Sequence, residues 1–160
     1  MSRIRLRPAR TGDQARLIAL QRDTIGSSYR PFLGDAVVDG FIGSGAVEAY
    51  VETTIERCRV LVLDGQIVGC AVLEADLLDL MMIEPPRQRQ GLGSRLLAEV
   101  ERDLFAQHPE IRLESFALNN QANVFYRKHN WTEVERFADR ESGVDKLLFT
   151  KRRETSGRVR

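Results

Sequence analysis

The sequence has few of the features that mark secreted, membrane-spanning or metal-dependent proteins. Only two of its 160 residues are cysteines, Cys58 and Cys70, and only two are histidines. The cysteines lack the spacing of metal ligands, so we expect no metal site and two free, buried thiols in a reducing cytoplasm. No apolar run approaches the ~18 residues of a membrane span, and no signal-peptide pattern opens the chain. These absences predict a cytoplasmic protein that does not enter a membrane.

The sequence also lacks an excess of charge of either sign. It has 24 Lys and Arg against 23 Asp and Glu, a formal net charge of +1, which favours neither nucleic acid nor a membrane surface as partner. The length suits one domain with a substantial core. Only residues 151–160 stand out, because they carry five basic side chains and no apolar pattern. We therefore predict a single domain over residues 1–150, in a monomer or homodimer, and a basic, disordered tail over 151–160.

Hydrophobic periodicity predicts that strands and helices alternate along the chain. The pair Asp64-Gly65, between two apolar runs, is the strongest hairpin signal. Thr11 or Asp13 is expected to cap the first helix, whose apolar face includes Ala15 and Leu17. Strands are expected at 4–7, 60–63, 67–73, 77–83, 111–118, 131–138 and 144–150, and later helices at 35–41, 47–57, 92–105 and 121–129. With no linker or repeat, this order predicts an α/β (α+β mixed) fold with a mixed sheet and helices on both faces.

Six residues near the middle of the chain, 88–93 (QRQGLG), are the most informative. They connect the predicted strand 77–83 to the amphipathic helix 92–105. A turn of this kind leaves backbone N–H groups unpaired at the helix start, and the helix dipole adds partial positive charge there. Gly91 and Gly93 let a ligand approach the backbone and permit positive φ angles. The turn is therefore predicted to bind a phosphate or pyrophosphate.

Two common phosphate-binding motifs fit this turn poorly. A dinucleotide-binding G-x-G-x-x-G would need a third glycine where Leu96 stands, and it usually opens its domain. A P-loop needs Gly-Lys-Ser/Thr, a tripeptide that does not occur in this chain. The alternative to a phosphate-binding site is an ordinary turn, formed by Pro85, Pro86 and the glycines, that leads into a surface helix and binds no ligand.

The residues around the turn resemble a known family at two independent places. Residues 83–93 (IEPPRQRQGLG) are similar to V-x-P-x-x-[QR]-x-x-G-x-[GA], a signature of the GNAT acetyltransferase superfamily. Residues 119–131 (NNQANVFYRKHNW) are similar to the family's N-x-x-A-x-x-F-Y-x-x-x-G-F. Asn130 and Trp131 replace the usual Gly-Phe, but Asn also tolerates the left-handed conformation at a helix end, and Trp131 can fill the aromatic position. The resemblance extends from about residue 60 to about residue 150.

This resemblance implies a GNAT-like, mostly antiparallel twisted sheet and an acetyl-CoA-dependent N-acetyltransferase. The implied reaction transfers the acetyl group to a primary amine, of a small molecule or a protein N-terminus, by direct attack in a ternary complex. The backbone of residues 81–83 is implied to pair with the pantetheine arm like an added strand, while their side chains are expected in the core. The implied cofactor-binding residues are Met81, Met82, Ile83, Gln88, Arg89, Gln90, Gly91, Leu92, Gly93, Ser94, Asn119 and Tyr126.

Two residues are implied to be catalytic. Tyr126 corresponds to the tyrosine that often faces the coenzyme sulfur as general acid, and a phenol of pKa about 10 is protonated at neutral pH. Glu114, five positions before Asn119, resembles the general base of acetyltransferases that act on ribosomal-protein N-termini. Asp79 is a second candidate base, since a lone carboxylate in an apolar strand must face a cleft, a partner or water. Tyr126 as a core aromatic residue and Glu114 as a solvated strand residue are the alternatives.

Two other functions stay open. A non-catalytic acyl-CoA-binding module of the same fold would keep the turn but would not need Tyr126. A nucleotide- or nucleic-acid-binding protein could use the same anion site with the basic tail. The presence of Tyr126 and Asn119 favours the enzyme. The acceptor is expected to lie against residues 24–52, where Tyr29, Arg30 and Asp35 could line a groove, but no residue there fixes its chemistry.

Overall fold

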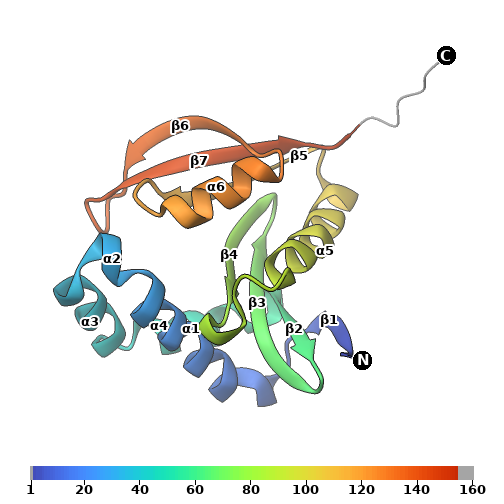
Figure 1. Ribbon diagram of the computed structural model, residues 1–160, viewed down its shortest axis with the longest axis horizontal. Helices are drawn as coiled ribbons and strands as arrows, with labels where there is room; N and C mark the ends of the chain where they lie inside the picture. Colours follow the sequence, from blue (N-terminus) through green and yellow to red (C-terminus); the bar gives the residue numbers. More distant parts are fainter. Residues whose placement is uncertain (1, 155–160) are drawn as a thin grey trace.

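The computed structural model describes residues 2–154, which form one mixed sheet covered by helices on both faces (Figure 1). The strand order is β1-β2-β3-β4-β5-β7-β6, and every neighbouring pair is antiparallel except the parallel pair of β4 and β5. The predicted mixed, mostly antiparallel sheet is thus confirmed. The strands are β1 Ile4–Pro8, β2 Cys58–Leu63, β3 Gln66–Glu74, β4 Leu77–Ile83, β5 Glu110–Phe116, β6 Thr132–Ala138 and β7 Asp145–Arg152.

Two apolar clusters lie on opposite faces of this sheet. One packs α5 and α6 against the sheet, and the other packs α1, α3 and α4 against it. The helix predicted to be amphipathic, α5, buries one i, i+4 stripe of apolar residues, formed by Leu92, Leu96, Val100 and Leu104. The α-helices are α1 Gln14–Ser28, α2 Arg30–Leu33, α3 Asp35–Gly43, α4 Ala46–Thr54, α5 Leu92–Gln107 and α6 Asn120–Lys128, and the short 3-10 helices are η1 Thr11–Asp13, η2 Ile55–Arg57 and η3 Pro85–Arg87. Among the described residues, no helix has both the length and the apolar character needed to cross a membrane.

Residues with left-handed backbone conformations form the β2–β3 hairpin turn and the C-terminal stop of α6, at the positions predicted from the sequence. Asp64 and Gly65 have φ angles of 50° and 84° between β2 and β3, as a type I′ turn requires. Asn130, just after α6, has a φ angle of 69°. The Asn130 N–H donates to the Arg127 carbonyl, and the Trp131 N–H donates to the Tyr126 carbonyl. This pair of bonds is a Schellman ending, so asparagine serves here in place of the family's glycine.

The first helix begins differently from the expectation. Asp13 does not cap α1, because its carboxylate accepts hydrogen bonds from the Arg7 guanidinium and the Arg10 backbone N–H, both at 2.8 Å. The bond from Arg7 is the main reason that the pKa of Asp13 is lowered. Ala15, expected on the buried face, is exposed. The helix also continues through Gly26 to Ser28, although glycine and serine favour turns over helices.

The tail predicted over residues 151–160 includes two residues, Lys151 and Arg152, that are part of the sheet. Lys151 and Arg152 belong to β7, where they pair with Ile111 and Glu110 of β5. The Lys151 ammonium also lies 2.7 Å from the Glu101 carboxylate, which accepts a second hydrogen bond from the Trp131 indole. Sheet pairing and this ion pair therefore hold residues that composition alone assigned to a tail. Residues 155–160 of the predicted tail lie outside the described residues.

Strand β4 has a β-bulge in its ladder with β3. Leu80 pairs with Val72 of β3 and Leu78 with Leu73, so Asp79 is a surplus residue on β4. Bulges bend a strand and increase its twist. Beside the bulge, β4 and β5 pair only at Leu77–Arg112 and Leu78–Leu113, and the two strands diverge beyond that point (Figure 1). The sheet therefore has a V-shaped opening between β4 and β5, with its apex at Leu78.

Gly69 of β3 allows the close approach of the C-terminal end of β4. A Cβ at this buried position would lie 2.9 Å from the Met82 carbonyl oxygen and 2.7 Å from Ile83 Cδ1. Because the carbonyl is part of the paired strand, Gly69→Ala should destabilise the protein by about 1–3 kcal/mol in chemical denaturation. Gly12→Ala is the control, since no atom lies within 4 Å of its Cβ position. Equal stability of the two variants would contradict this account of the packing.

Candidate functional site

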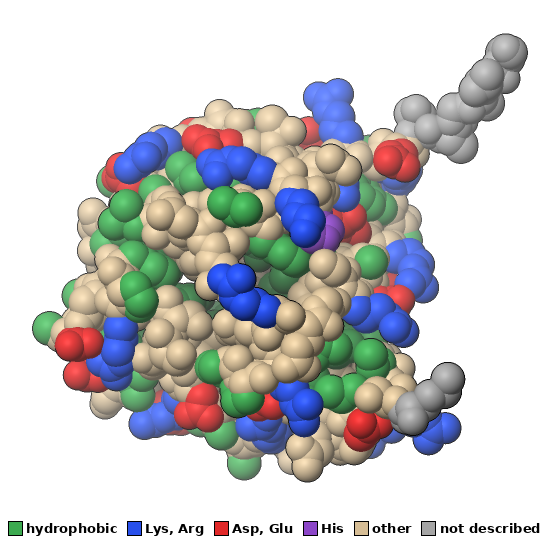
Figure 2. Space-filling view, in the orientation of Figure 1, with side chains coloured by type: hydrophobic (Ala, Val, Ile, Leu, Met, Phe, Trp, Pro, Cys, Tyr) green, Lys and Arg blue, Asp and Glu red, His purple; other side chains and the backbone are tan. Residues whose placement is uncertain are grey.

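The opening between β4 and β5 appears as a hollow on the surface. Figure 2 shows this hollow near the middle of the view, between α6 above and the α1–α2 region below, with Lys and Arg side chains around its mouth. Tyr29, at the C-terminal end of α1, packs against Phe116 of β5 with ring centroids 5.9 Å apart, and the Phe116 carbonyl accepts a hydrogen bond from Asn123 of α6. The α1–α2 layer and α6 therefore both reach Phe116, on the part of β5 that lies beyond its last pair with β4.

The turn before α5 presents backbone N–H groups that no side chain caps. Arg89 and Gly91 have φ angles of 63° and 82°, and Gly91 is the N-cap of α5. Within residues 2–154, no side chain accepts a hydrogen bond from the first turn of this helix. By contrast, α6 has a conventional cap, because Asn119 Oδ1 accepts from the Ala122 N–H at 3.3 Å. The N–H groups of Leu92–Ser94 and the helix dipole together suit an anion.

The two glutamines of this turn bind the protein backbone. Gln88 Nε2 donates to the Ile83 carbonyl at 2.9 Å, and Gln90 Nε2 donates to the Pro86 carbonyl at 3.2 Å. These bonds fold the turn back onto the end of β4 and onto η3. Both side chains therefore shape the turn, and a direct contact of either one with a ligand stays a prediction.

The two sequence motifs meet at the start of α5. The Phe125 ring lies 3.5 Å from the position that a Cβ of Gly93 would take, which is van der Waals contact distance, so the start of α5 lies close to this ring. Ser94 Oγ lies 3.0 Å from His129 Nε2, and His129 Nδ1 lies 2.9 Å from the Phe125 carbonyl oxygen. These contacts fix α6 relative to the turn.

The backbone of β4 offers hydrogen-bonding groups to the opening. The Glu84 N–H donates to the Val68 carbonyl at 2.9 Å, which makes the two a hydrogen-bonded pair of the antiparallel ladder. Such pairs alternate along a ladder, so the backbone groups of Met82 point to β3 and those of Met81 and Ile83 point to the opening. The Met82 side chain is buried, as expected. Of the three residues, Met81 and Ile83 have the geometry that an added strand needs.

Tyr126 is buried except for 8% of its surface and packs against the rings of Trp131 and Phe149. Burial is the main cause of its raised pKa, and the Tyr29 phenol is the second. Within residues 2–154 its hydroxyl makes no hydrogen bond that could compete with a ligand. The phenol is therefore a protonated donor at neutral pH.

Carboxylates flank the apex of the opening on both strands. Asp79 and Glu114 are the first residues after the last pair, Leu78–Leu113. Asp79 Oδ2 accepts a 2.5 Å hydrogen bond from the Tyr50 hydroxyl, whereas Glu114 lies 3.7 Å from the Lys146 ammonium. Two other carboxylates next to β4, Asp76 and Glu84, have arginine partners, Arg112 and Arg16 respectively.

Sequence reasoning missed two residues at this site. Tyr50 belongs to no motif and meets Asp79 from α4. Asn123 is 2% exposed, and its Nδ2 donates to the carbonyls of Phe116 and Ala117 at 3.1 Å, which fixes the turn after β5. Asn123 could have been found from the sequence, because it is a polar residue at a position where the apolar repeat of α6 predicts burial. Arg30, which could line an acceptor groove, pairs with Asp35 and Asp39 and so holds α2 to α3.

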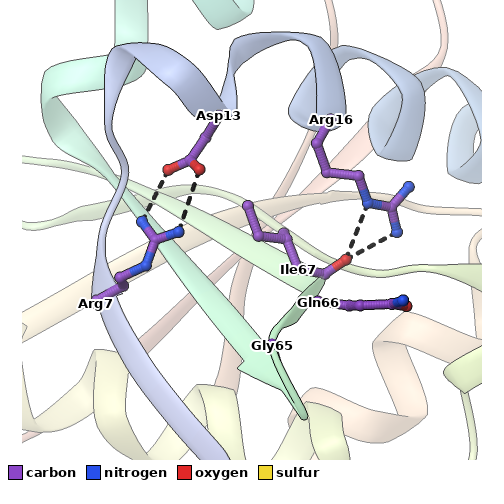
Figure 3. Close-up of a pocket in the computed structure, with 6 residues that line it drawn as sticks. All are labelled: Arg7, Asp13, Arg16, Gly65, Gln66 and Ile67. Carbon is purple, nitrogen blue, oxygen red and sulfur yellow. Dashed lines mark hydrogen bonds and ion pairs between the residues drawn. The ribbon is translucent and has the colours of Figure 1, made fainter.

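A separate pocket of about 470 Å³ lies between β1, the start of α1 and the β2–β3 hairpin (Figure 3). Its charged side chains already have partners within the protein. Arg7 is bonded to Asp13, and Arg16 donates to the Ile67 carbonyl at 2.8 Å and to the Glu84 carboxylate. These bonds leave the pocket with little unpaired charge for a ligand, so the opening between β4 and β5 is the better candidate site.

Comparison with protein families gives one match and agrees with this choice. The acetyltransferase (GNAT) domain matches residues 54–133, half of the 160-residue chain. The matched region includes β4, the turn around Gly91 and all of α6. No curated protein matches the sequence.

Solved structures of the same fold are numerous. A GCN5-related N-acetyltransferase from Rhodopseudomonas palustris superposes with a TM-score of 0.81 at 18% identity, covering 92% of this chain and 94% of that chain. The PaiA N-acetyltransferase from Thermoplasma acidophilum, in complex with coenzyme A, gives 0.78 at 18% identity, covering 94% and 99%. The ribosomal-protein-S18-alanine N-acetyltransferase from Escherichia coli gives 0.67 at 17% identity, covering 97% of both chains. At these identities the likeness shows the fold.

Proposed function

Because the chain belongs to the GNAT acetyltransferase family, we propose that it is an acetyl-CoA-dependent N-acetyltransferase that acts on a primary amine. The observation that carries the proposal is the opening between β4 and β5, which lies between the uncapped turn around Gly91 and α6, the helix that carries Tyr126. The similar Thermoplasma acidophilum protein holds coenzyme A, which supports acetyl-CoA as the donor.

In this proposal the coenzyme occupies the opening. Its pyrophosphate accepts hydrogen bonds from the N–H groups around Gly91, Leu92, Gly93 and Ser94, with Arg89 and Gln90 beside it. Its pantetheine arm pairs with the backbone of Met81 and Ile83 on either side of Met82. Gln88 keeps the turn in place, and Asn119 positions α6.

The chemical step is direct attack of the amine on the thioester carbonyl. The C–N bond forms, the C–S bond breaks, and the leaving thiolate receives the proton of the Tyr126 phenol. The proton that the nitrogen loses on becoming an amide then restores the phenol. The amine must first lose a proton, which costs roughly 4.6 kcal/mol at pH 7 for a lysine-like amine of pKa about 10.4. Glu114 stays the proposed acceptor of that proton, with Asp79 as the second candidate, although Lys146 already occupies the Glu114 carboxylate.

Ligand-induced stabilisation tests the donor. Acetyl-CoA at 100 times its Kd should stabilise the folded protein by about 2.7 kcal/mol and raise the Tm by several degrees. ATP and NAD, compared in the same melting experiment, should have a much smaller effect, because neither has a pantetheine arm to pair with β4. Equal stabilisation by ATP would instead favour a nucleotide-binding protein.

Thiol release separates the enzyme from the alternative, a non-catalytic acyl-CoA-binding module or sensor of this fold. Such a module would be stabilised by acetyl-CoA but would release no coenzyme A thiol with any primary amine. The free Tyr126 hydroxyl favours the enzyme, because binding alone gives a buried phenol no role.

A further inference from the structure

Asp79 stands at the point where the sheet opens, and its carboxylate is held in one orientation. As the surplus residue of the bulge, it follows the last β4–β5 pair directly, and bulges commonly re-aim a side chain at such sites. The Tyr50 hydroxyl donates to Asp79 Oδ2 at 2.5 Å, the length of a strong charge-assisted bond. Burial of Tyr50, followed by this bond, raises the pKa of Tyr50, so the phenol remains a donor at neutral pH.

The charge of Asp79 has no counter-ion. Within residues 2–154, no Lys, Arg or His nitrogen lies within 4.0 Å of its carboxylate, whereas Asp76, Glu84 and Glu114 each have a basic partner. The basic side chain across the apex, Lys146, is shared between Glu114 and Asp139. At the apex, Lys146 is thus engaged by Glu114 and Asp139, and among the described residues the Asp79 carboxylate is left without a basic partner.

Aromatic rings lie on the same side of the sheet as Glu114. Tyr29, Phe32 and Phe116 form a cluster with ring centroids 5.4–5.9 Å apart, and Phe116 is two residues beyond Glu114 on β5. The Lys146 ammonium already lies 5.2 Å from the Phe116 ring centroid. Aromatic faces attract cations in this way, so this surface suits an alkylammonium group.

We propose that the acceptor is a primary amine with a second, non-reacting positive charge, and that Asp79 binds this charge. The acceptor class presupposes the acetyl transfer proposed above. Asp79 acts as a specificity-determining residue, and Tyr50 acts as a positioning residue through it. An acidic acceptor would place like charges together at the apex, and a neutral one would leave Asp79 without a cation.

Three four-carbon amines test this proposal, because they share the reacting group and differ only at the far end. They are 1,4-diaminobutane, n-butylamine and 4-aminobutanoate, assayed by thiol release from acetyl-CoA. The diamine should exceed n-butylamine in kcat/KM by about 10- to 100-fold, as expected for a hydrogen bond to a charged group. The carboxylate-bearing amine should be the poorest substrate. Raising the ionic strength should reduce the preference for the diamine.

Variants of Asp79 and Tyr50 test whether the preference for the diamine over n-butylamine depends on the Asp79 carboxylate. Asp79→Asn should bring the diamine-to-butylamine ratio of kcat/KM close to one, and Tyr50→Phe should lower it in part. Asp23→Asn, an exposed carboxylate on α1, is the matched control and should keep the wild-type ratio. Melting temperatures of all variants check that each one folds.

The outcomes separate this proposal from the proposed function. Equal kcat/KM for the diamine and n-butylamine, or an unchanged ratio in Asp79→Asn, would overturn the acceptor class and leave acetyl transfer standing. Stabilisation by acetyl-CoA without thiol release from the diamine would overturn it too. Absence of any stabilisation by acetyl-CoA would instead refute the proposed function.

Discussion

Replacing Gly91 by valine is expected to raise the KM for acetyl-CoA by about 100-fold or more. Gly91 has φ 82° and ψ 0° at the N-cap of α5, a conformation that β-branched residues almost never adopt. The substitution would turn the following N–H groups away and put a side chain beside them. Steady-state kinetics with varied acetyl-CoA, together with the loss of ligand-induced stabilisation, measure the effect.

Gly45→Val is the matched control. Gly45 is the N-cap of α4 with φ 84° and ψ 7°, and neither glycine has an atom within 4 Å of its Cβ position. Both variants should therefore lose similar stability from backbone strain, but only Gly91→Val should change the KM. An unchanged KM in Gly91→Val would mean that the coenzyme's diphosphate binds elsewhere.

Tyr126→Phe should lower kcat by about 10- to 1000-fold and leave acetyl-CoA binding nearly unchanged. Phenylalanine keeps the contacts with Trp131 and Phe149, so the variant loses only the proton donor. Single-turnover rates and the Kd from calorimetry separate the two effects. A wild-type rate in this variant would remove Tyr126 from the mechanism.

The pH dependence gives a second measure of the same residue. Burial raises the pKa of Tyr126 above its usual value of about 10. The phenol therefore keeps its proton, and the stability it contributes, below about pH 10, and loses both as the pH rises through the folded-state value. The wild-type rate should increase from pH 7 toward pH 10 as the amine deprotonates. A decline within this range that is absent from Tyr126→Phe would contradict the raised pKa.

Local patterns in the sequence predicted the parts of the site that local geometry determines. The turn at Gly91 and the stripe of α5 depend on φ angles and on i, i+4 spacing. The stop at Asn130 depends on a residue that tolerates a left-handed conformation. A short window of sequence contains all of this information, so these elements are correct in type and close to their bounds.

Contacts between distant elements account for what the sequence did not predict. Tyr50 and Asp79 come from α4 and β4, and no periodicity relates them. The sequence predicted only that a lone Asp79 needs a partner, a cleft or water, which agrees with its exposed carboxylate and its bond to Tyr50. The last turn of α1, which is rich in glycine and serine, is stabilised by a hydrogen bond that Arg30 Nε donates to the Gly26 carbonyl. Residue types alone could not show this bond.

The two paired positions between β4 and β5 also have a consequence for folding. Strands β1–β4 and strands β5–β7 each form an extensive antiparallel ladder, whereas the seam between them holds only Leu77–Arg112 and Leu78–Leu113. Ladders that pair widely separated segments form slowly, and this seam gains little from its own hydrogen bonds. We therefore expect the two halves to join late, so that catalytic competence appears only with the final native state.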